Sequence, residues 1–338
     1  MTKHSPVAHA YRVVKLDQRS RMIHASGLSH RFRTKQGPVD AVRGVDIDIA
    51  ESELVGFLGP NGAGKTTTMR MLTTLLPPTA GEATVAGRDL RTDPFGVRRR
   101  IGYVPQSGSA GMDRRVGDEL RTQGRFHGQS RAEARRKCAE LLDRFDLSDL
   151  DQRPVAALSG GQRRRLDIAL GLIHDPRLLF LDEPSTGLDP HSRANLWEHV
   201  RALRAGHGTT VLISTHYLDE ADALCDRLLV IDHGRIVATG TPEELKQRVS
   251  GDLVVFTCAD PATAATAVRA MPEATDVRTE GGEVRLRTAR GDTALTALLR
   301  RLDSAGITPL SLRVERPSLD DVFLELTGHS LREASVAA

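Results

Sequence analysis

The chain has 338 residues, of which 39% are hydrophobic and 27% are charged, a balance typical of a globular protein that folds in water. Its formal net charge of +3 is too small for a dedicated nucleic-acid-binding protein. Its longest apolar runs fall far short of the roughly 18 residues that cross a bilayer. Three cysteines, Cys138, Cys225 and Cys258, are too widely spaced to suggest a metal site.

The first segment, residues 1–20, is polar and has basic residues without an apolar core. We expect a flexible leader, no secretory signal peptide and a protein that stays in the cytoplasm. Strand patterns begin at residue 21. Met22–Ser26 and Val45–Ile49 are rich in strand-forming residues, and the second alternates apolar and polar side chains.

A glycine-rich octapeptide follows the apolar run Leu54–Leu58 and precedes a helical pattern that begins at Thr67. It matches G-x-x-x-x-G-K-[ST], and its residues are Gly59, Pro60, Asn61, Gly62, Ala63, Gly64, Lys65 and Thr66. Such a loop turns successive backbone N–H groups towards phosphates at a helix N-terminus, where the helix dipole favours anions. A flexible glycine loop with a chance lysine is the alternative, and the strand and helix that flank the loop disfavour it. The sequence predicts a nucleoside triphosphate site.

The next strand, Ile101–Val104, ends at Pro105 and is followed by Gln106. Residues from about 107 to 157 then favour helices, and Ser130 with Glu133 forms the pattern of a capping box. This composition predicts a helical insertion within an α/β domain. Arginine clusters, including Arg163–Arg165, are expected on solvated helix faces because acidic residues balance them.

A second glycine-rich turn opens the helical pattern Gln162–Ile173, and its residues are Ser159, Gly160, Gly161 and Gln162. Without regard to its position in the chain, this turn could equally be an ordinary helix cap. Its place between the helical insertion and an acidic strand end favours a second anion-binding helix terminus.

The acidic strand end is Asp182-Glu183, after the apolar run Leu178–Leu181. Ligands of parallel α/β sheets bind at this edge. Adjacent residues of an extended strand point to opposite sides, so one carboxylate could serve Mg²⁺ and the other polarise water. An idle, solvated acidic pair is the alternative. His216 follows another strand at the same edge, where it either contacts phosphate or is a satisfied core histidine.

Strands and helices alternate up to about residue 248, which predicts a mainly parallel sheet covered on both faces. Residues 252–328 then follow the order β-α-β-β-α-β, typical of a small split-βαβ sandwich. Because this segment lacks a cluster of catalytic residue types, we expect it to serve contact or regulation. Residues 329–338 form a short tail.

Taken in order, these motifs resemble an ATP-binding cassette (ABC) ATPase over roughly residues 21–245. The arginine run, extended to Asp167, and the tail Pro317–Leu324 resemble the daunorubicin-resistance-type subfamily of bacterial exporters. The resemblance implies a P-loop α/β nucleotide-binding domain over 21–248, with a mainly parallel core sheet, an antiparallel β subdomain and the helical insertion. It also implies a C-terminal α+β accessory domain over 252–328.

The resemblance implies ATP and Mg²⁺ as cofactors. Glu183 would be the catalytic base, with Lys65, Gln106 and His216 as its catalytic partners, and Asp189 would lie at an interface between cassettes. Mg²⁺ would be held by Thr66, Gln106 and Asp182. The nucleotide would be bound by Phe32, by Gly59 to Thr67 and by Ser159 to Gln162. Phe32 replaces the more usual tyrosine that stacks on adenine and keeps the π face without the hydroxyl; a core phenylalanine is the alternative.

The implied partners are a second identical subunit, closing around two ATP molecules, and a separate transmembrane permease. The protein would lie at the cytoplasmic face of the plasma membrane and drive export of a hydrophobic drug or natural product, with no nucleic-acid partner. A soluble ABC ATPase that acts on ribosomes or nucleic acid is the alternative, although such proteins usually have two cassettes or a long coiled coil. A nucleotide-gated binding module without turnover is disfavoured because Lys65, Glu183 and His216 are intact.

Overall fold

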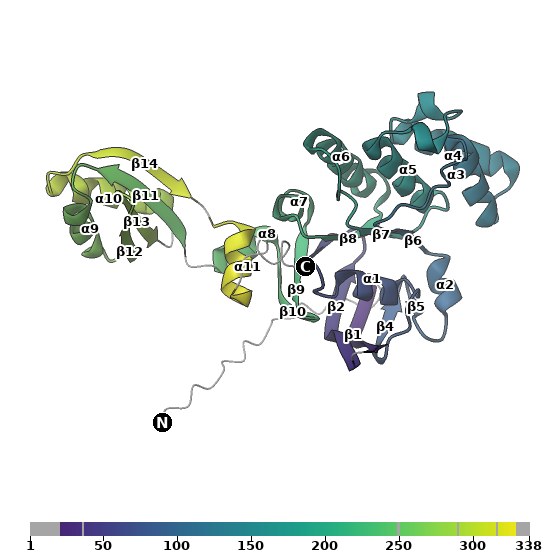
Figure 1. Ribbon diagram of the computed structural model, residues 1–338, viewed down its shortest axis with the longest axis horizontal. Coiled ribbons are helices and arrows are strands. Elements are labelled where there is room, and N and C mark those ends of the chain that lie inside the picture. The colour runs from purple at the N-terminus through teal and green to yellow at the C-terminus, as the bar shows by residue number, and fades with distance from the viewer. Residues whose placement is uncertain (1–20, 36, 249–250, 289–290, 316, 329–338) are drawn as a thin grey trace.

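The computed structural model describes residues 21–35, 37–248, 251–288, 291–315 and 317–328. The predicted leader 1–20 and tail 329–338 lie outside these residues. Figure 1 shows a large α/β body and a smaller α/β body, with two short helices between them. Within the described part of the chain, no helix combines the length and the apolar character needed to cross a membrane.

The large body is built on a six-stranded sheet in the order β10-β9-β3-β8-β7-β6. All neighbouring pairs are parallel except β9 and β10. The strands are β3 (Leu54–Leu58), β6 (Ile101–Val104), β7 (Leu178–Asp182), β8 (Thr210–Thr215), β9 (Arg227–Asp232) and β10 (Arg235–Gly240). Every residue of β3, β7 and β8 is buried, as expected for parallel strands covered on both faces. The predicted mainly parallel sheet is confirmed.

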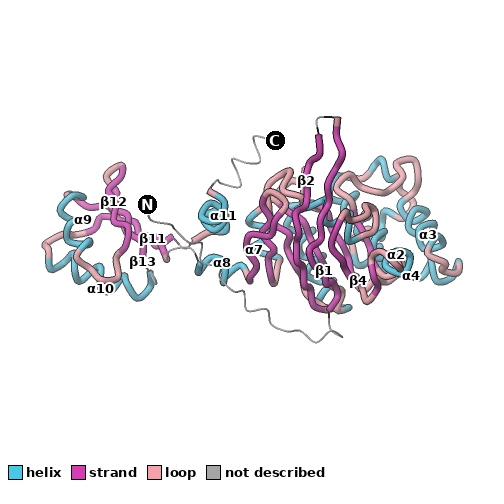
Figure 2. The backbone as a smooth tube through the Cα atoms, turned by 90° about the horizontal axis from the view of Figure 1, so that it is seen from below, coloured by secondary structure: helices cyan, strands magenta, loops and turns pink. Residues whose placement is uncertain are grey.

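An antiparallel sheet in the order β2-β1-β4-β5 packs beside it. Its strands are β1 (Arg21–Thr34), β2 (Gly37–Ala50), β4 (Ala80–Val85) and β5 (Arg88–Asp89). Figure 2 shows β1, β2 and β4 side by side. The hairpin of β1 and β2 is longer than the sequence predicted. Its outer part is largely exposed and therefore lacks the apolar alternation from which strands are predicted.

The helical insertion contains α3 (Val116–Phe126) and α4 (Arg131–Arg144), followed by two 3₁₀ turns, Ser148–Leu150 and Val155–Ala157. The predicted capping box is present: Ser130 Oγ accepts from the Glu133 N–H, and Glu133 Oε2 accepts from the Ser130 N–H. The other helices of the large body are α1 (Lys65–Leu72), α2 (Pro94–Arg98), α5 (Gly160–Leu172), α6 (Pro190–His207), α7 (Leu218–Leu224) and α8 (Pro242–Arg248).

The smaller body has the predicted β-α-β-β-α-β order. Its elements are β11 (Asp252–Cys258), α9 (Pro261–Arg269), β12 (Thr275–Glu280), β13 (Glu283–Thr288), α10 (Gly291–Ser304) and β14 (Pro309–Glu315). The four strands form an antiparallel sheet in the order β12-β13-β11-β14. Phe256 of β11 and Leu286 of β13 pack with Val268 of α9 and Leu302 of α10 in a separate core. The prediction of a small α+β unit is confirmed.

The last helix, α11 (Leu319–Thr327), returns to the large body and packs on α8 and α7 (Figure 1). Leu319, Val322 and Phe323 are buried in the same hydrophobic cluster as Leu224 of α7 and Leu245 of α8. The small body is therefore attached to the large one at both ends, through α8 before it and α11 after it. One of the helices that α11 contacts, α7, follows His216 in the chain.

Replacing Phe323 by Ala is expected to lower the free energy of unfolding of the large body by about 3 kcal/mol, because a fully buried ring is lost and a cavity remains. Urea denaturation of the full chain measures this change. Leu324→Ala on the same helix is the matched control. Its side chain is 47% exposed, so its cost should be about 1 kcal/mol or less. Equal effects of the two substitutions would contradict the docking of α11.

Candidate active site

The phosphate loop connects β3 to α1, and two of its glycines are required by the space around them. A Cβ at Gly59 would lie 2.3 Å from the carbonyl oxygen of Ile231. Gly64 has φ +105°, and a Cβ there would lie 2.6 Å from the carbonyl oxygen of Ala41. Neither contact is tolerable for a larger residue, and positive φ favours glycine. The loop therefore packs closely on the large body, while Asn61, Gly62 and Thr66 remain exposed to a ligand.

The first turn of α1 is suited to an anion. Gly64 occupies its N-cap, and no side chain caps the helix. In contrast, Ser130, Ser159, Asp189 and Ser318 cap α4, α5, α6 and α11 with their side chains. The first N–H groups of a helix need external acceptors, and the positive end of the helix dipole points the same way. A triphosphate fits this position.

Lys65 lies at the mouth of the loop and is only 4% exposed. Its Nζ donates to the carbonyl oxygens of Gly59 at 2.7 Å and Pro60 at 3.0 Å, and it lies 3.3 Å from Glu183 Oε1. Burial lowers the pKa of Lys65, and the negative charges of Glu183 and Asp182 oppose that shift. The ammonium group is thus held between the phosphate loop and the Glu183 carboxylate.

Asp182 ends β7 and is surrounded by hydroxyl groups. Its Oδ1 accepts from Thr66 Oγ1 at 3.1 Å and from Ser214 Oγ at 2.6 Å, and its Oδ2 accepts from Tyr103 OH at 3.3 Å. Burial, followed by the charge of Asp182, raises the pKa of Tyr103 to about 12, so this phenol remains a donor. Oxygen ligands of this kind suit Mg²⁺, which in phosphate-transfer sites is bound by one or two carboxylates and by the phosphates.

The described residues contain no group of three or more His, Cys, Asp or Glu side chains that could hold a metal ion by themselves. The set of Thr66 and Asp182 is thus incomplete without a ligand that brings further oxygens. Such a set fits a Mg²⁺ ion that arrives with a nucleotide. Gln106 was predicted to contact the same ion, but its amide nitrogen donates to Glu183 Oε2 at 3.0 Å.

The prediction that Glu183 continues the extended strand of Asp182 is wrong, because β7 ends at Asp182. The φ of Glu183 is +45°, in the left-handed region that costs a non-glycine residue roughly 1–2 kcal/mol. Its backbone N–H donates to Ser214 O at 3.1 Å and Ser214 Oγ at 3.0 Å. The chain therefore turns sharply at Glu183, and this turn, rather than strand alternation, separates its carboxylate from that of Asp182. Strained residues of this kind are concentrated at functional sites.

The Glu183 carboxylate is the point where the predicted catalytic residues converge. Oε1 faces Lys65, and Oε2 lies 3.3 Å from His216 Nδ1, 3.0 Å from Gln106 Nε2 and 3.3 Å from Thr186 Oγ1. Burial would raise the pKa of Glu183, but the nearby His216 imidazole and the charge of Lys65 outweigh burial and lower the pKa to about 2. Glu183 is therefore an ionised carboxylate in this arrangement.

The other predicted site residues do not contact the Glu183 carboxylate. Ser159 and Gln162 cap α5 reciprocally, through Ser159 Oγ and Gln162 Oε1, and Gly160 and Gly161 begin that helix. Asp189 caps α6. Phe32 is on β1 and is 37% exposed, with its ring edge-on to His30, so it is not a core residue. Thr67 lies half-buried in the first turn of α1.

Several site residues were missed by the sequence analysis. Ser214 contacts both acidic residues, and its register opposite Asp182 on β8 could have revealed it. Thr186 belongs to the motif segment Ser185–Asp189, in which a role was predicted only for Asp189, and Tyr103 had no sequence signal. The prediction that Arg164 lies on a solvated helix face is wrong. Its side chain is 6% exposed and donates hydrogen bonds to backbone carbonyl oxygens of the active site.

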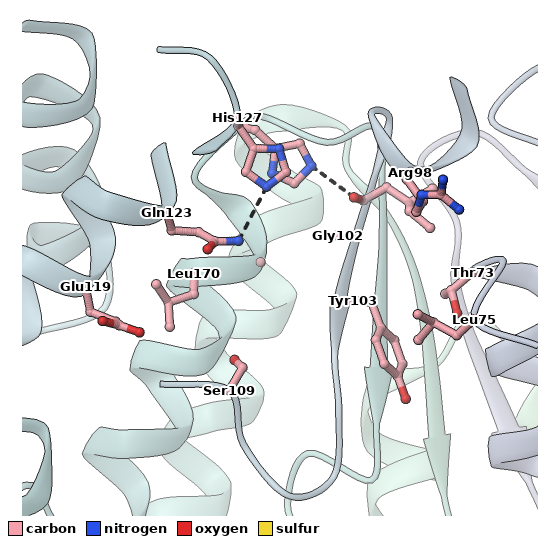
Figure 3. Close-up of a pocket in the computed structure, with 13 residues that line it drawn as sticks. Thr73, Leu75, Arg98, Gly102, Tyr103, Ser109, Glu119, Gln123, His127 and Leu170 are labelled. Atoms are coloured by element: carbon pink, nitrogen blue, oxygen red, sulfur yellow. Dashed lines mark hydrogen bonds between the residues drawn. The ribbon is translucent and has the colours of Figure 1, made fainter. Parts of the chain in front are cut away.

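A cavity of about 300 Å³ lies between the helical insertion and the edge of the large sheet (Figure 3). Ser109, which lines this cavity, belongs to the loop of residues 105–110 that contains Gln106, here called the Gln106 loop. Tyr103 and Ser109 line it on the side of the active site, and Glu119 and Gln123 of α3 line it on the insertion. At one end the rings of His127 and His174 stack, with 3.8 Å between their centroids.

A phosphate loop between a buried strand and a helix, beside an acidic strand end in a parallel sheet, defines a P-loop nucleotide-binding protein. The model of the ABC transporter family matches residues 42–186, and that of the ATP-binding protein DrrA1-3-like C-terminal domain matches residues 240–327. The daunorubicin resistance ATP-binding protein DrrA3 of Streptomyces coeruleorubidus is 44% identical over 90% of this chain and 96% of its own length.

Two solved structures share the fold of about two thirds of this chain. CbiO1 of Clostridium perfringens, part of the ABC transporter complex cbiONQ, has a TM-score of 0.62 and 26% identity over 67% of this chain and 90% of its own. The dimeric bacterial ABC transporter cassette MJ0796 has a TM-score of 0.60 and 24% identity over 65% of this chain and 98% of its own. The chain belongs to the family of ABC transporter ATP-binding proteins. It is an ATPase of that family.

Proposed function

We propose that this chain is the ATP-hydrolysing subunit of an export transporter, in which two copies close around two ATP molecules and drive a separate membrane permease. The observation that carries the proposal is the convergence of Lys65, Gln106 and His216 on the Glu183 carboxylate, beside Asp182 and the phosphate loop. A binding module without turnover would have no need of a strained, buried carboxylate at this position.

In the proposed mechanism the backbone from Gly59 to Thr67 holds the phosphates, and Lys65 contacts the β- and γ-phosphates. Thr66 and Asp182 would hold Mg²⁺, with Gln106 turning to it once nucleotide is bound. The ion would supply positive charge at the β- and γ-phosphate oxygens. Glu183 would accept a proton from the attacking water, and His216 would contact the γ-phosphate.

The arrangement of Lys65 suggests how binding activates the base. In the structure its ammonium group is paired with Glu183 and, together with His216, holds the pKa of that carboxylate low. A carboxylate with so low a pKa is a weak base. When Lys65 moves to the phosphates, Glu183 loses part of this stabilisation and its pKa rises. Binding of ATP would thus strengthen Glu183 as the base that takes a proton from the attacking water.

The proposed dimer is based on the second glycine-rich helix terminus, where Ser159 and Gln162 cap each other within this chain, and a phosphate group would have to replace that cap. Ser159 to Gln162 begin α5, and we assign them to the ATP that the other copy holds on its phosphate loop. Asp189 would lie in the same interface, and the exposed ring of Phe32 would stack on adenine. Residues 252–328, which overlap the DrrA1-3-like C-terminal match at residues 240–327, would be an accessory unit attached to the nucleotide-binding domain 21–248.

The permease would be a separate polypeptide that places the ATPase at the cytoplasmic face of the plasma membrane. Its docking place would be the cavity beside the Gln106 loop, because Tyr103 and Ser109 connect that cavity to Asp182 and to the loop. CbiO1 is part of a transporter complex, and the DrrA3 relative is named for daunorubicin resistance. We therefore assign export of a hydrophobic drug or natural product.

The full chain, co-expressed with a candidate multi-helix permease, is expected to sediment with membranes and to remain in the supernatant when expressed alone. Inverted vesicles that contain both proteins should accumulate daunorubicin when ATP is added, and vesicles with the Glu183→Gln chain should not. Sedimentation with ribosomes in the presence of ATP, without membrane association, would contradict the proposal and favour the ribosome-acting alternative.

A further inference from the structure

Helix α5 carries two charged residues that are buried one turn apart. Arg164 is 6% exposed and Asp167 is 3% exposed. Arginine and aspartate are almost never buried to this extent without partners. Here the partners are backbone groups of two active-site segments, the turn at Glu183 and the loop that follows Gln106.

Arg164 binds three carbonyl oxygens. Its Nε donates to Pro184 O at 2.8 Å, and its Nη2 donates to Asp182 O at 3.0 Å. These two carbonyls flank Glu183. The remaining arm, Nη1, donates to Pro105 O at 2.7 Å, directly before Gln106. A guanidinium group is a rigid planar fork, so its three bonds fix the relative positions of both segments.

Asp167 holds the far side of the Gln106 loop. Its Oδ1 accepts from the Ser109 N–H at 2.8 Å, the Ser109 hydroxyl at 3.2 Å and the Ala110 N–H at 3.3 Å. Its Oδ2 lies 3.9 Å from Arg164 Nη1, so the two charges stabilise each other in the interior. The Gln106 loop is therefore attached to α5 at its beginning by Arg164 and at its end by Asp167.

The turn at Glu183 needs this support. Ser214 holds the Glu183 N–H, and Arg164 holds the carbonyls before and after that residue. Together they maintain a left-handed backbone that a glutamate would otherwise leave. Without Arg164 the carboxylate would lose its fixed direction while its chemistry stayed intact.

We propose that Arg164 and Asp167 are positioning residues that make α5 a rigid connection from the Ser159–Gln162 terminus to Glu183 and Gln106. This inference rests on the proposed dimer, in which that terminus contacts ATP bound by the other copy. ATP in one site would then set the direction of Glu183 in the other site through α5. Such a connection would make ATP hydrolysis at the two sites of the dimer cooperative.

The test is steady-state ATP turnover by the full chain with Mg-ATP. Arg164→Gln should lower kcat about a hundredfold, the effect of misplacing a reacting group by about 1 Å, with KM changed less than about threefold. The Hill coefficient should fall towards 1. Arg165→Gln is the matched control, because Arg165 pairs with the exposed Asp146 and should leave kcat unchanged. Asp167→Asn, which keeps the shape of the side chain, should lower kcat about fivefold to tenfold. This variant tests the same proposal if Arg164→Gln does not fold.

A double-mutant cycle separates positioning from a general structural effect. In a Glu183→Gln chain, adding Arg164→Gln should cause less than about a twofold further loss, because Arg164 acts through Glu183. Equal losses in both backgrounds, or an unchanged Hill coefficient in Arg164→Gln, would overturn this inference alone. If Glu183→Gln by itself hydrolysed ATP at the native rate, the proposed function would fail together with it.

Discussion

The Glu183→Gln variant is expected to bind ATP as tightly as the native chain and to hydrolyse it about a thousandfold more slowly, as befits the loss of a general base. Glutamine has nearly the same shape and can still accept the hydrogen bond from Gln106, but it cannot take a proton from water. Release of inorganic phosphate measures the rate, and titration with a fluorescent ATP analogue measures affinity.

The same variant is expected to accumulate as a dimer when ATP is present, because the closed state can no longer be opened by hydrolysis. Size-exclusion chromatography with and without Mg-ATP detects this change. Glu198→Gln is the matched control, since Glu198 is exposed on α6. Fast turnover by the Glu183→Gln chain would move the role of the base to another residue.

The Lys65→Ala variant is expected to bind ATP at least about a hundredfold more weakly, because charge-assisted hydrogen bonds contribute about 1.5–3 kcal/mol each. The substitution removes the positive group at the mouth of the loop and also leaves the buried Glu183 without its lysine partner. Loss of this positive charge raises the pKa of Glu183. Titration with the fluorescent ATP analogue measures the affinity.

Lys246→Ala is the control for this substitution, because Lys246 pairs with Asp222 between α8 and α7 and lies outside the phosphate loop. It should bind ATP with native affinity. Native affinity in Lys65→Ala as well would remove the phosphate-loop assignment, and thermal melting of both variants shows whether the fold is intact.

The sequence predicted those features that depend on neighbouring residues. The phosphate loop is a local octapeptide between a strand and a helix, and β3 and β7 are short apolar runs of buried parallel strands. The capping box at Ser130 was predicted for the same reason. Each of these patterns is completed within a few residues of the chain.

The missed features depend on residues that are far apart in the chain. The turn at Glu183 is held by Ser214 and Arg164, which belong to β8 and α5. No local pattern indicates that a glutamate will have positive φ. Arg164 belongs to a run of three arginines, and its burial depends on carbonyl groups of two distant segments. The docking of α11 likewise depends on the surface that α7 and α8 form together.

The central claim is that two copies enclose ATP, each contributing half of the site. A crystal structure of the Glu183→Gln chain with ATP and Mg²⁺ tests it most directly. The claim predicts Ser159 of one copy within hydrogen-bonding distance of the γ-phosphate that Lys65 of the other copy contacts. A structure in which Ser159 lies far from every γ-phosphate, in all assemblies of the crystal, would contradict it.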